Sequence, residues 1–216
     1  MSGVESLYPF LYANGGSSVA DLLEEVRRST ADKAAEIVAL RQRMAAGYAD
    51  RLAACAAALA GSFSSGGRMF TFGNGGSSSD AQAVAQLFLD PGPGARALPA
   101  VALTTDVAVV TALSNDVGFE VVFARQLAAF ARPGDVAVGL STSGGSANVL
   151  AAFAEASRLG LVTVGFAGYD GGRMAEAAEA GTIDHLFVVP SPSVHRIQEA
   201  QTTTYHVLWE LTQSCL

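Results

Sequence analysis

The feature that most constrains the fold is the alternation, after Gly61, of short apolar runs with longer helical segments. The apolar runs lack polar alternation, which is typical of parallel strands that are buried on both faces. Helical segments between such strands are the usual crossover connections of a parallel sheet. We therefore expect an α/β fold, an open five-stranded parallel sheet flanked by helices. The predicted strands are Met69–Phe72, Pro99–Leu103, Val136–Leu140, Leu161–Phe166 and Leu186–Val189. The predicted helices are Asp80–Leu89, Val107–Leu113, Val121–Phe130, Asn148–Leu159, Met174–Ala180 and Val194–Thr212.

The N-terminal part has a different pattern. Residues 1–17 read as an irregular arm that ends in Asn-Gly-Gly-Ser punctuation. From Ser29 to Ala60, apolar residues recur at spacings of three and four, which predicts a helix of about 30 residues, or about 45 Å. Ser29 is the expected N-cap and Gly61 the expected stop. We interpret this segment as an assembly helix; the alternative is two helices broken near Gly47.

Composition excludes several classes of protein. Charged residues make up 15% of the chain, which argues against disorder, and the net charge of −7 disfavours nucleic acid as a direct partner. No apolar stretch approaches the roughly 20 residues of a membrane span, and the N-terminus does not resemble a signal peptide. We therefore expect a cytoplasmic protein without a membrane partner. No break in composition divides the 216 residues. One domain is expected, with 1–61 as arm and assembly helix and 62–216 as the α/β core.

Cysteine and histidine usage gives no sign of a metal or disulfide framework. Cys55 and Cys215 lie far apart in the sequence, which fits free thiols in a reducing compartment. No Cys/His/Asp cluster has the spacing of a ligand set. We expect no metal and no cofactor.

The first loop with functional character is Gly73–Asp80, with the sequence GNGGSSSD. It follows a predicted strand and opens a helix. Its glycines let the backbone approach a ligand, the helix N-terminus offers N–H groups, and the serines add hydroxyl donors. This makes an anion site without a cation. It has neither the Walker sequence nor the GxGxxG spacing. Taken alone, it could also be a plain strand-to-helix turn with Asp80 in the first helical turn.

The second loop is Ser141–Ser146, with the sequence STSGGS, and it follows another buried strand. Ligands of open α/β sheets bind at the carboxyl ends of the strands. Two such loops in one sheet predict a phosphate site. Because the donors are N–H and O–H groups, the site accounts for the scarcity of Lys and Arg nearby.

Four motifs in order resemble the sugar isomerase (SIS) domain of the phosphoheptose isomerase (GmhA-like) family: GNGGSSSDA, NDVGF, STSGGSAN and RIQE. The resemblance covers roughly residues 30–212. It implies a homotetramer that interconverts sedoheptulose 7-phosphate and a heptose phosphate, with a sugar phosphate as partner. Gly145 replaces the Asn that is usual in the second loop. The resemblance assigns phosphate contacts to Ser77, Ser141, Thr142, Ser143 and Ser146, first-loop backbone contacts to Asn74, Gly75 and Gly76, sugar contacts to Asp106 and Gln198, and general acid/base chemistry to His206.

One departure from the family concerns catalysis. Aldose–ketose isomerisation needs a base at the carbon acid and a group that moves a proton at oxygen. Aligned without gaps from Ser77, the family's histidine and catalytic glutamate on the first core helix correspond to Ala83 and Leu87, which cannot transfer a proton. Gln86, next to Leu87, is no base either.

The last helix carries the remaining candidates. Five polar residues fall on one of its faces: His195, Gln198, Glu199, Thr202 and His206. Glu199 or His195 is the candidate replacement base. The alternative is that Glu199 and Gln198 bond to backbone groups while His195 lies exposed.

Two functional hypotheses follow. The first is an isomerase-like enzyme with weak or altered activity, in which His206 and Glu199 are the catalytic candidates. The second is a non-catalytic module that senses a phosphosugar or presents its oligomer to a protein partner. The replication-initiator-associating protein DiaA, a relative within this superfamily, resembles this second kind. The family motifs favour the enzyme, and Ala83 and Leu87 favour the module.

Overall fold

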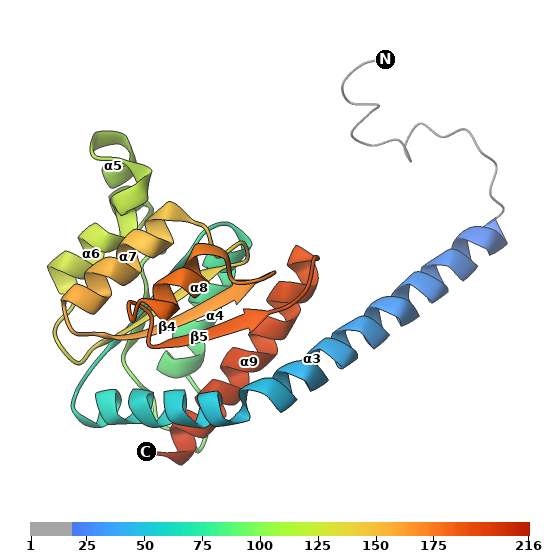
Figure 1. Cartoon of the computed structure of the whole chain (residues 1–216), viewed down its shortest axis with the longest axis horizontal. Coiled ribbons are helices and arrows are strands. Elements are labelled where there is room, and N and C mark those ends of the chain that lie inside the picture. The colour runs from blue at the N-terminus through green and yellow to red at the C-terminus, as the bar shows by residue number, and fades with distance from the viewer. Residues whose placement is uncertain (1–18) are drawn as a thin grey trace. The chain divides into compact units, whose positions relative to one another are not determined.

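The computed structural model describes residues 19–216, so the expected arm at 1–17 lies outside the described residues. The chain divides after Val38 into two compact units, each of which is described by itself. The unit Ala39–Leu216 contains the whole sheet (Figure 1). The strands are β1 (Met69–Gly73), β2 (Ala100–Ala102), β3 (Val136–Ser141), β4 (Val162–Gly168) and β5 (His185–Val189). The helices are α3 (Val19–Ser64), α4 (Gly76–Leu89), α5 (Val107–Asp116), η1 (a 3-10 helix, Phe119–Val121), α6 (Val122–Phe130), α7 (Ala147–Arg158), α8 (Gly172–Glu179) and α9 (Val194–Ser214).

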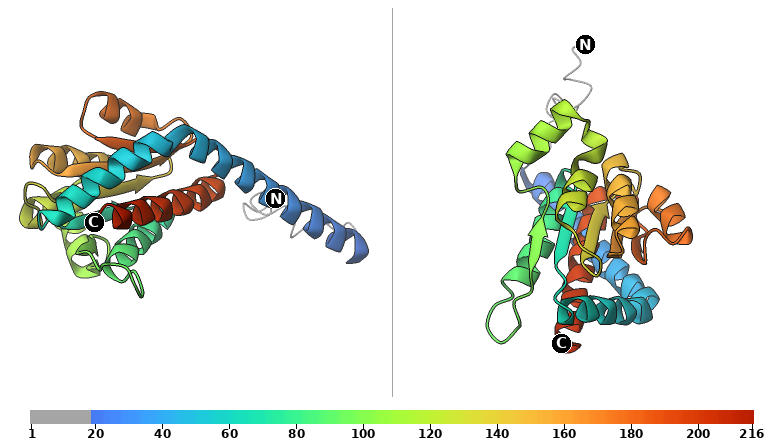
Figure 2. Two further views of the ribbon diagram at one scale, coloured as in Figure 1. Left: turned by 90° about the horizontal axis from the view of Figure 1, so that it is seen from below. Right: turned by 90° about the vertical axis from the view of Figure 1, so that its left-hand side faces the viewer.

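The five strands form one parallel sheet in the order β2-β1-β3-β4-β5, which confirms the predicted fold class. Helices cover both faces (Figure 2). Alternate strand residues enter two separate apolar clusters. The C-terminal part of α3 covers one face together with α4 and α9, and α6, α7 and α8 cover the other. The central strands β1 and β3 are buried along their whole length, as their apolar sequences require.

Helix α3 is longer than its predicted range at both ends, with 46 residues. Ser29 does not cap it, because Ser29 lies inside the helix and its hydroxyl accepts a hydrogen bond from the ammonium of Lys33. Gly61 does not end it either. The chain leaves the helix after Ser64, and Gly66 with a φ of 85° supplies the left-handed conformation that ends a helix. The alternative of two helices is wrong, since α3 continues through Gly47.

Tyr48 of α3 covers the open edge of the sheet at β5. Its hydroxyl donates to the carbonyl oxygen of Val188 at 3.0 Å and accepts from the Val188 N–H at 3.0 Å. Its ring packs edge-on against Phe187. An edge strand with unpaired backbone groups invites pairing with another chain, and this contact occupies one such pair of groups.

No helix within residues 19–216 combines the length and the apolar character that crossing a membrane requires.

Candidate functional site

The two predicted loops lie at the carboxyl ends of β1 and β3, which are neighbours in the sheet. A pair of side-chain amides joins them. Asn74 Nδ2 donates to Asn148 Oδ1 at 2.8 Å, and Asn148 Nδ2 donates to Asn74 Oδ1 at 2.8 Å. Asn148 also accepts from the Val149 N–H at 3.0 Å and is only 3% exposed. The first loop is therefore held against the start of α7, directly after the second loop, by both ends of the two amides.

Asn148 is a site residue that the sequence analysis missed. It belongs to the STSGGSAN motif, but only the hydroxyl and glycine positions of that motif were assigned a role. An amide directly after a hydroxyl-rich loop has no partner that sequence alone identifies. Its partner is 74 residues away and is brought near only by the parallel pairing of β1 and β3.

Helix α4 begins at Gly76, four residues before its predicted start. The first loop is therefore shorter than expected, and the helix N-terminus opens directly onto it. The Ser77 side chain lies in this first turn and is 5% exposed. Asp80 lies in the second turn, not in the first as the simple-turn reading required. A helix N-terminus that faces a glycine-rich turn favours an anion through its N–H groups and its dipole.

In the second loop, three serine hydroxyls converge. Ser141 Oγ lies 3.0 Å from Ser146 Oγ and 3.4 Å from Ser143 Oγ, and the Gly145 N–H donates to Ser143 Oγ at 3.2 Å. Ser141 is buried at 4% exposure, whereas Ser143 is exposed. The cluster thus has a buried base and an open rim. Thr142, between Ser141 and Ser143, is half-buried.

Gly144 gives the second loop its shape. It has a φ of 64°, and a Cβ on it would lie 1.9 Å from the carbonyl oxygen of Gly171. Its own carbonyl oxygen accepts from the Met174 N–H at 2.9 Å. A side chain at this position would collide with backbone atoms that cannot move aside. The loop conformation therefore requires glycine here.

The last helix meets the first loop at Gln198. Gln198 Nε2 donates to Asp80 Oδ2 at 3.4 Å, and a Cβ on Gly76 would lie 2.2 Å from the same nitrogen. Burial raises the pKa of Asp80, and the hydrogen bond from Gln198 partly opposes that rise. Nearby, Tyr205 donates to Thr202 Oγ1 at 3.4 Å. Burial is the main cause that raises the pKa of Tyr205, and the charge of Asp80 adds to it.

The two predicted catalytic residues lie on the outer side of α9. Glu199 is exposed and forms an ion pair with Arg196, so the alternative in which it bonds to backbone groups is wrong for its carboxylate. The Gln198 amide donates to the Asp80 carboxylate, so the alternative is wrong for the Gln198 side chain as well. His206 is exposed and stacks on Tyr205, with ring centroids 5.2 Å apart. Within residues 19–216, no side-chain hydrogen bond, ion pair or ring contact joins Glu199 or His206 to either loop. His195 is exposed, as the alternative reading expected.

Asp106 is also not brought to the loops. Its carboxylate caps α5 by accepting from the Val109 N–H at 3.0 Å. It lines a cavity of about 320 Å³ beside the edge strand β2, together with Arg68 and Gln126. No residue of either loop lines this cavity.

Gln198 contacts Gly76 and Asp80 of helix α4. These two residues are spaced by three and four with Ala83 and Leu87 and share one face of the helix with them. Ala83 is exposed, and Leu87 packs partly buried against the core. Within residues 19–216, no group of three or more His, Cys, Asp or Glu side chains could hold a metal ion.

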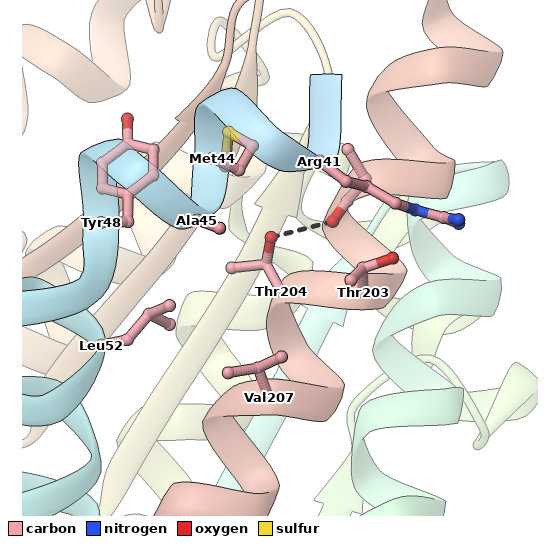
Figure 3. A pocket seen from close by; sticks show the side chains of 9 residues that line it. Arg41, Met44, Ala45, Tyr48, Leu52, Thr203, Thr204 and Val207 are labelled. Carbon is pink, nitrogen blue, oxygen red and sulfur yellow. Dashed lines mark hydrogen bonds between the residues drawn. The ribbon is translucent and has the colours of Figure 1, made fainter. Parts of the chain in front are cut away.

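A further cavity, of about 90 Å³, lies between α3 and α9 and is almost entirely apolar (Figure 3). It contains no residue of either loop. Thr204, on its wall, uses its hydroxyl to bond the Ala200 carbonyl oxygen at 2.8 Å. The cavity therefore has little polar chemistry with which to recognise a sugar phosphate. It is lined by Arg41, Met44, Ala45, Tyr48, Leu52, Ala200, Thr203, Thr204 and Val207.

Comparisons with known proteins agree with this fold. The SIS domain family matches residues 34–168. A phosphoheptose isomerase of Aquifex aeolicus is 44% identical over 167 residues, which cover 77% of this chain and 85% of the relative. A phosphoheptose isomerase of Roseiflexus sp. is 42% identical over 178 residues, which cover 82% of this chain and 88% of the relative. The solved phosphoheptose isomerase GmhA of Neisseria gonorrhoeae superposes with a TM-score of 0.80 at 34% identity, covering 88% of this chain and 99% of that one. The chain therefore belongs to the phosphoheptose isomerase family of SIS-domain proteins.

Proposed function

We propose that the chain binds a sugar phosphate at the two loops, with sedoheptulose 7-phosphate as the first candidate. The observation that carries the proposal is the Asn74–Asn148 amide pair, which holds the first loop against the start of α7, directly after the second loop. The first loop contributes the N-terminus of α4, and the second loop contributes a cluster of serine hydroxyls at the neighbouring strand end. The proposed phosphate ligands are Ser77, Ser141, Thr142, Ser143 and Ser146, with Asn74, Gly75 and Gly76 shaping the first loop.

The proposed chemistry is a slow aldose–ketose isomerisation. A base removes the proton from the carbon beside the carbonyl, an enediol forms, and the proton returns to the neighbouring carbon while another proton moves between the two oxygens. On the face of α4 that meets Gln198, Ala83 and Leu87 carry no group that can do this. Gln198 remains the proposed sugar contact from this chain. Asp106, which caps α5 apart from the loops, is proposed as a sugar contact only after rearrangement or from a neighbouring subunit.

The catalytic candidates on α9 require rearrangement or a second subunit. Glu199 must leave Arg196 before it can act as a base. His206, on the exposed side of α9, reaches a bound sugar if a neighbouring subunit is placed against that side. Homo-oligomerisation, with a tetramer as the expected state, is therefore part of the proposal.

A phosphosugar-sensing or protein-interaction module is the second candidate. The observation in its favour is the apolar character of positions 83 and 87 on α4, in a chain that has both loops. A sensor needs the loops but not the proton transfer. The cytoplasmic location and the single-domain organisation stay predictions from the sequence.

A calorimetric titration with sedoheptulose 7-phosphate and with inorganic phosphate tests binding. Hydrogen–deuterium exchange at the sugar carbons in deuterated water then tests proton transfer. Binding with slow exchange supports the enzyme, binding without exchange supports the sensor, and no binding of either compound overturns both.

A further inference from the structure

Asp80 and Gln198 form the contact between the last helix and the first loop. Asp80 follows Gly76 by one helical turn on the same face of α4. The Gln198 amide lies over Gly76, because a Cβ there would be 2.2 Å from Nε2, 3.1 Å from Cδ and 3.2 Å from Oε1. Nε2 also donates to Asp80 Oδ2 at 3.4 Å. The amide is thus held between a residue without a side chain and a carboxylate.

The contact with the carboxylate decides which way the amide points. An amide has a donor end and an acceptor end. The donor end, Nε2, faces Asp80 Oδ2. Oε1 is then left at the side of the first loop with its acceptor capacity available. A hydrogen-bond acceptor at this point suits a sugar hydroxyl and rejects a carbonyl or phosphate oxygen, which cannot donate.

Asp80 sits in a place that is unfavourable for a charge. The residue is half-buried, and no cation among the described residues forms an ion pair with it. Burial without a cation disfavours the ionised form, which agrees with the raised pKa.

We propose that Asp80 is a positioning residue, which fixes the Gln198 amide so that Oε1 accepts a hydrogen bond from a hydroxyl of the bound sugar. This inference rests on the proposed function, since it concerns the sugar end of the same site. It assigns Asp80 to recognition of the sugar, separate from the serines that are proposed to hold the phosphate.

The test is a double-mutant cycle read by calorimetry, with sedoheptulose 7-phosphate and inorganic phosphate as the two probes. Asp80→Ala frees the amide, and it should weaken binding of the sugar phosphate roughly two- to tenfold, the range for one neutral hydrogen bond. It should not weaken binding of inorganic phosphate. The double variant Asp80→Ala/Gln198→Ala should bind no more weakly than Gln198→Ala alone, because Asp80 acts through Gln198.

An exchanged pair gives the positive control. In Asp80→Asn/Gln198→Glu, the new carboxylate at 198 accepts from the new amide at 80, and its second oxygen remains an acceptor for the sugar. This pair should recover binding that Asp80→Ala loses. Its thermal unfolding shows whether the fold is intact, and it keeps the test valid where Asp80→Ala does not fold.

The outcomes separate the two proposals. A wild-type protein that binds neither probe overturns the proposed function and, with it, the sugar contact. A wild-type protein that binds the sugar phosphate, while Asp80→Ala binds it equally well or the two single losses simply add, overturns the positioning role alone. NMR gives a readout without ligand, the side-chain amide resonance of Gln198, which is assigned because it is missing from the spectrum of Gln198→Ala. This resonance should shift in Asp80→Ala; an unchanged chemical shift would show that Asp80 does not hold the amide.

Discussion

Asn74 and Asn148 bond each other through both ends of their amides, at 2.8 Å in each direction, and so join the first loop of the chain to the start of α7. The donor end and the acceptor end of each amide both face the other residue. We therefore expect their contribution to binding to be indirect: they set the distance between two loops whose donors must converge on one phosphate.

Replacing Asn148 by Ala should both destabilise the protein and weaken phosphate binding. The change leaves the amide of Asn74 without its partner and removes the contact to the Val149 N–H, which should cost about 1–3 kcal/mol of unfolding free energy. Denaturant unfolding measures the first effect and calorimetry the second. Asn115→Ala is the matched control, since the exposed Asn115 side chain donates its hydrogen bond to its sequence neighbour Asp116 and belongs to neither loop. Equal stability of the Asn148 variant and wild type would contradict the bridging role.

Ser77→Ala and Ser143→Ala should each weaken binding of a sugar phosphate. A hydrogen bond to a charged group is worth about 1.5–3 kcal/mol, which corresponds to roughly a tenfold or greater loss of affinity. Calorimetric titration measures it. Ser114→Ala is the control, because Ser114 bonds to the Val110 carbonyl oxygen on α5 and belongs to neither loop. Unchanged affinity in both loop variants would remove the phosphate assignment.

The sequence predicted the sheet well because buried parallel strands have a strong local signature. All five strands fall within two residues of their predicted ends. The start of α4 was placed late, because glycines and serines in GNGGSSS read as a loop while Gly76 and Ser77 already have helical geometry. The end of α3 was predicted too early, because Gly61 is typical of a helix end. In the structure Gly61 lies inside the helix, which continues to Ser64, and no other group of the described residues packs against it.

The site was predicted only in part. The loop serines directly follow predicted strands. Because the carboxyl ends of neighbouring parallel strands lie at one edge of the sheet, the sequence could predict that the two loops lie close together. Three other features depend on the tertiary structure, namely the Asn74–Asn148 bridge, the Asp80–Gln198 contact and the ion pair that occupies Glu199. Asn74 and Asn148 are 74 residues apart in the sequence, and Asp80 and Gln198 are 118 residues apart. No pattern in a single sequence indicates such pairs.

The pH dependence of stability should carry the signature of Asp80. Its pKa in the folded protein is raised above the ordinary value of 3.8, so the folded state holds the proton to higher pH than the unfolded state does. Unfolding free energy therefore falls, through this group, as pH rises from the unfolded pKa through the folded one, and stays lower above it. Asp80→Asn should gain stability relative to wild type over that interval and keep the gain at pH 7. Denaturant unfolding at a series of pH values measures it, with exposed Asp116→Asn as control. A difference that is independent of pH would contradict the raised pKa.

The chain should assemble into a closed homo-oligomer, most simply a tetramer. In the first part of α3, Val19, Leu22, Leu23 and Val26 are spaced by three and four along one face and all are exposed. An exposed apolar stripe of this kind favours association. Light scattering should give a mass about four times the 22.1 kDa of the chain. Leu22→Ser/Val26→Ser should shift it toward smaller species, whereas Glu25→Ser should not. A stable monomer of the wild type at micromolar concentration would contradict assembly.

Restoring the proton-transfer groups on α4 should raise turnover. In Ala83→His/Leu87→Glu, a histidine and a carboxylate stand on the face of α4 that meets Gln198. General acid–base catalysis by one group contributes about 10²–10⁴-fold, so we expect the wild-type rate on sedoheptulose 7-phosphate to lie about that far below the variant's. Leu87 is partly buried against the core, so the new carboxylate should also lower the unfolding free energy. Ala83→His/Leu87→Gln is the control, since it keeps the size and polarity of the new side chain but cannot take the proton.

The wild-type rate itself decides how this result is interpreted. Rapid turnover by the unaltered chain would show that the base lies elsewhere, and Glu199→Gln is then the variant to measure first. Breaking the ion pair with Arg196→Ala should in that case raise the rate, because it frees the Glu199 carboxylate. Full activity in Glu199→Gln would instead exclude α9's carboxylate as the base.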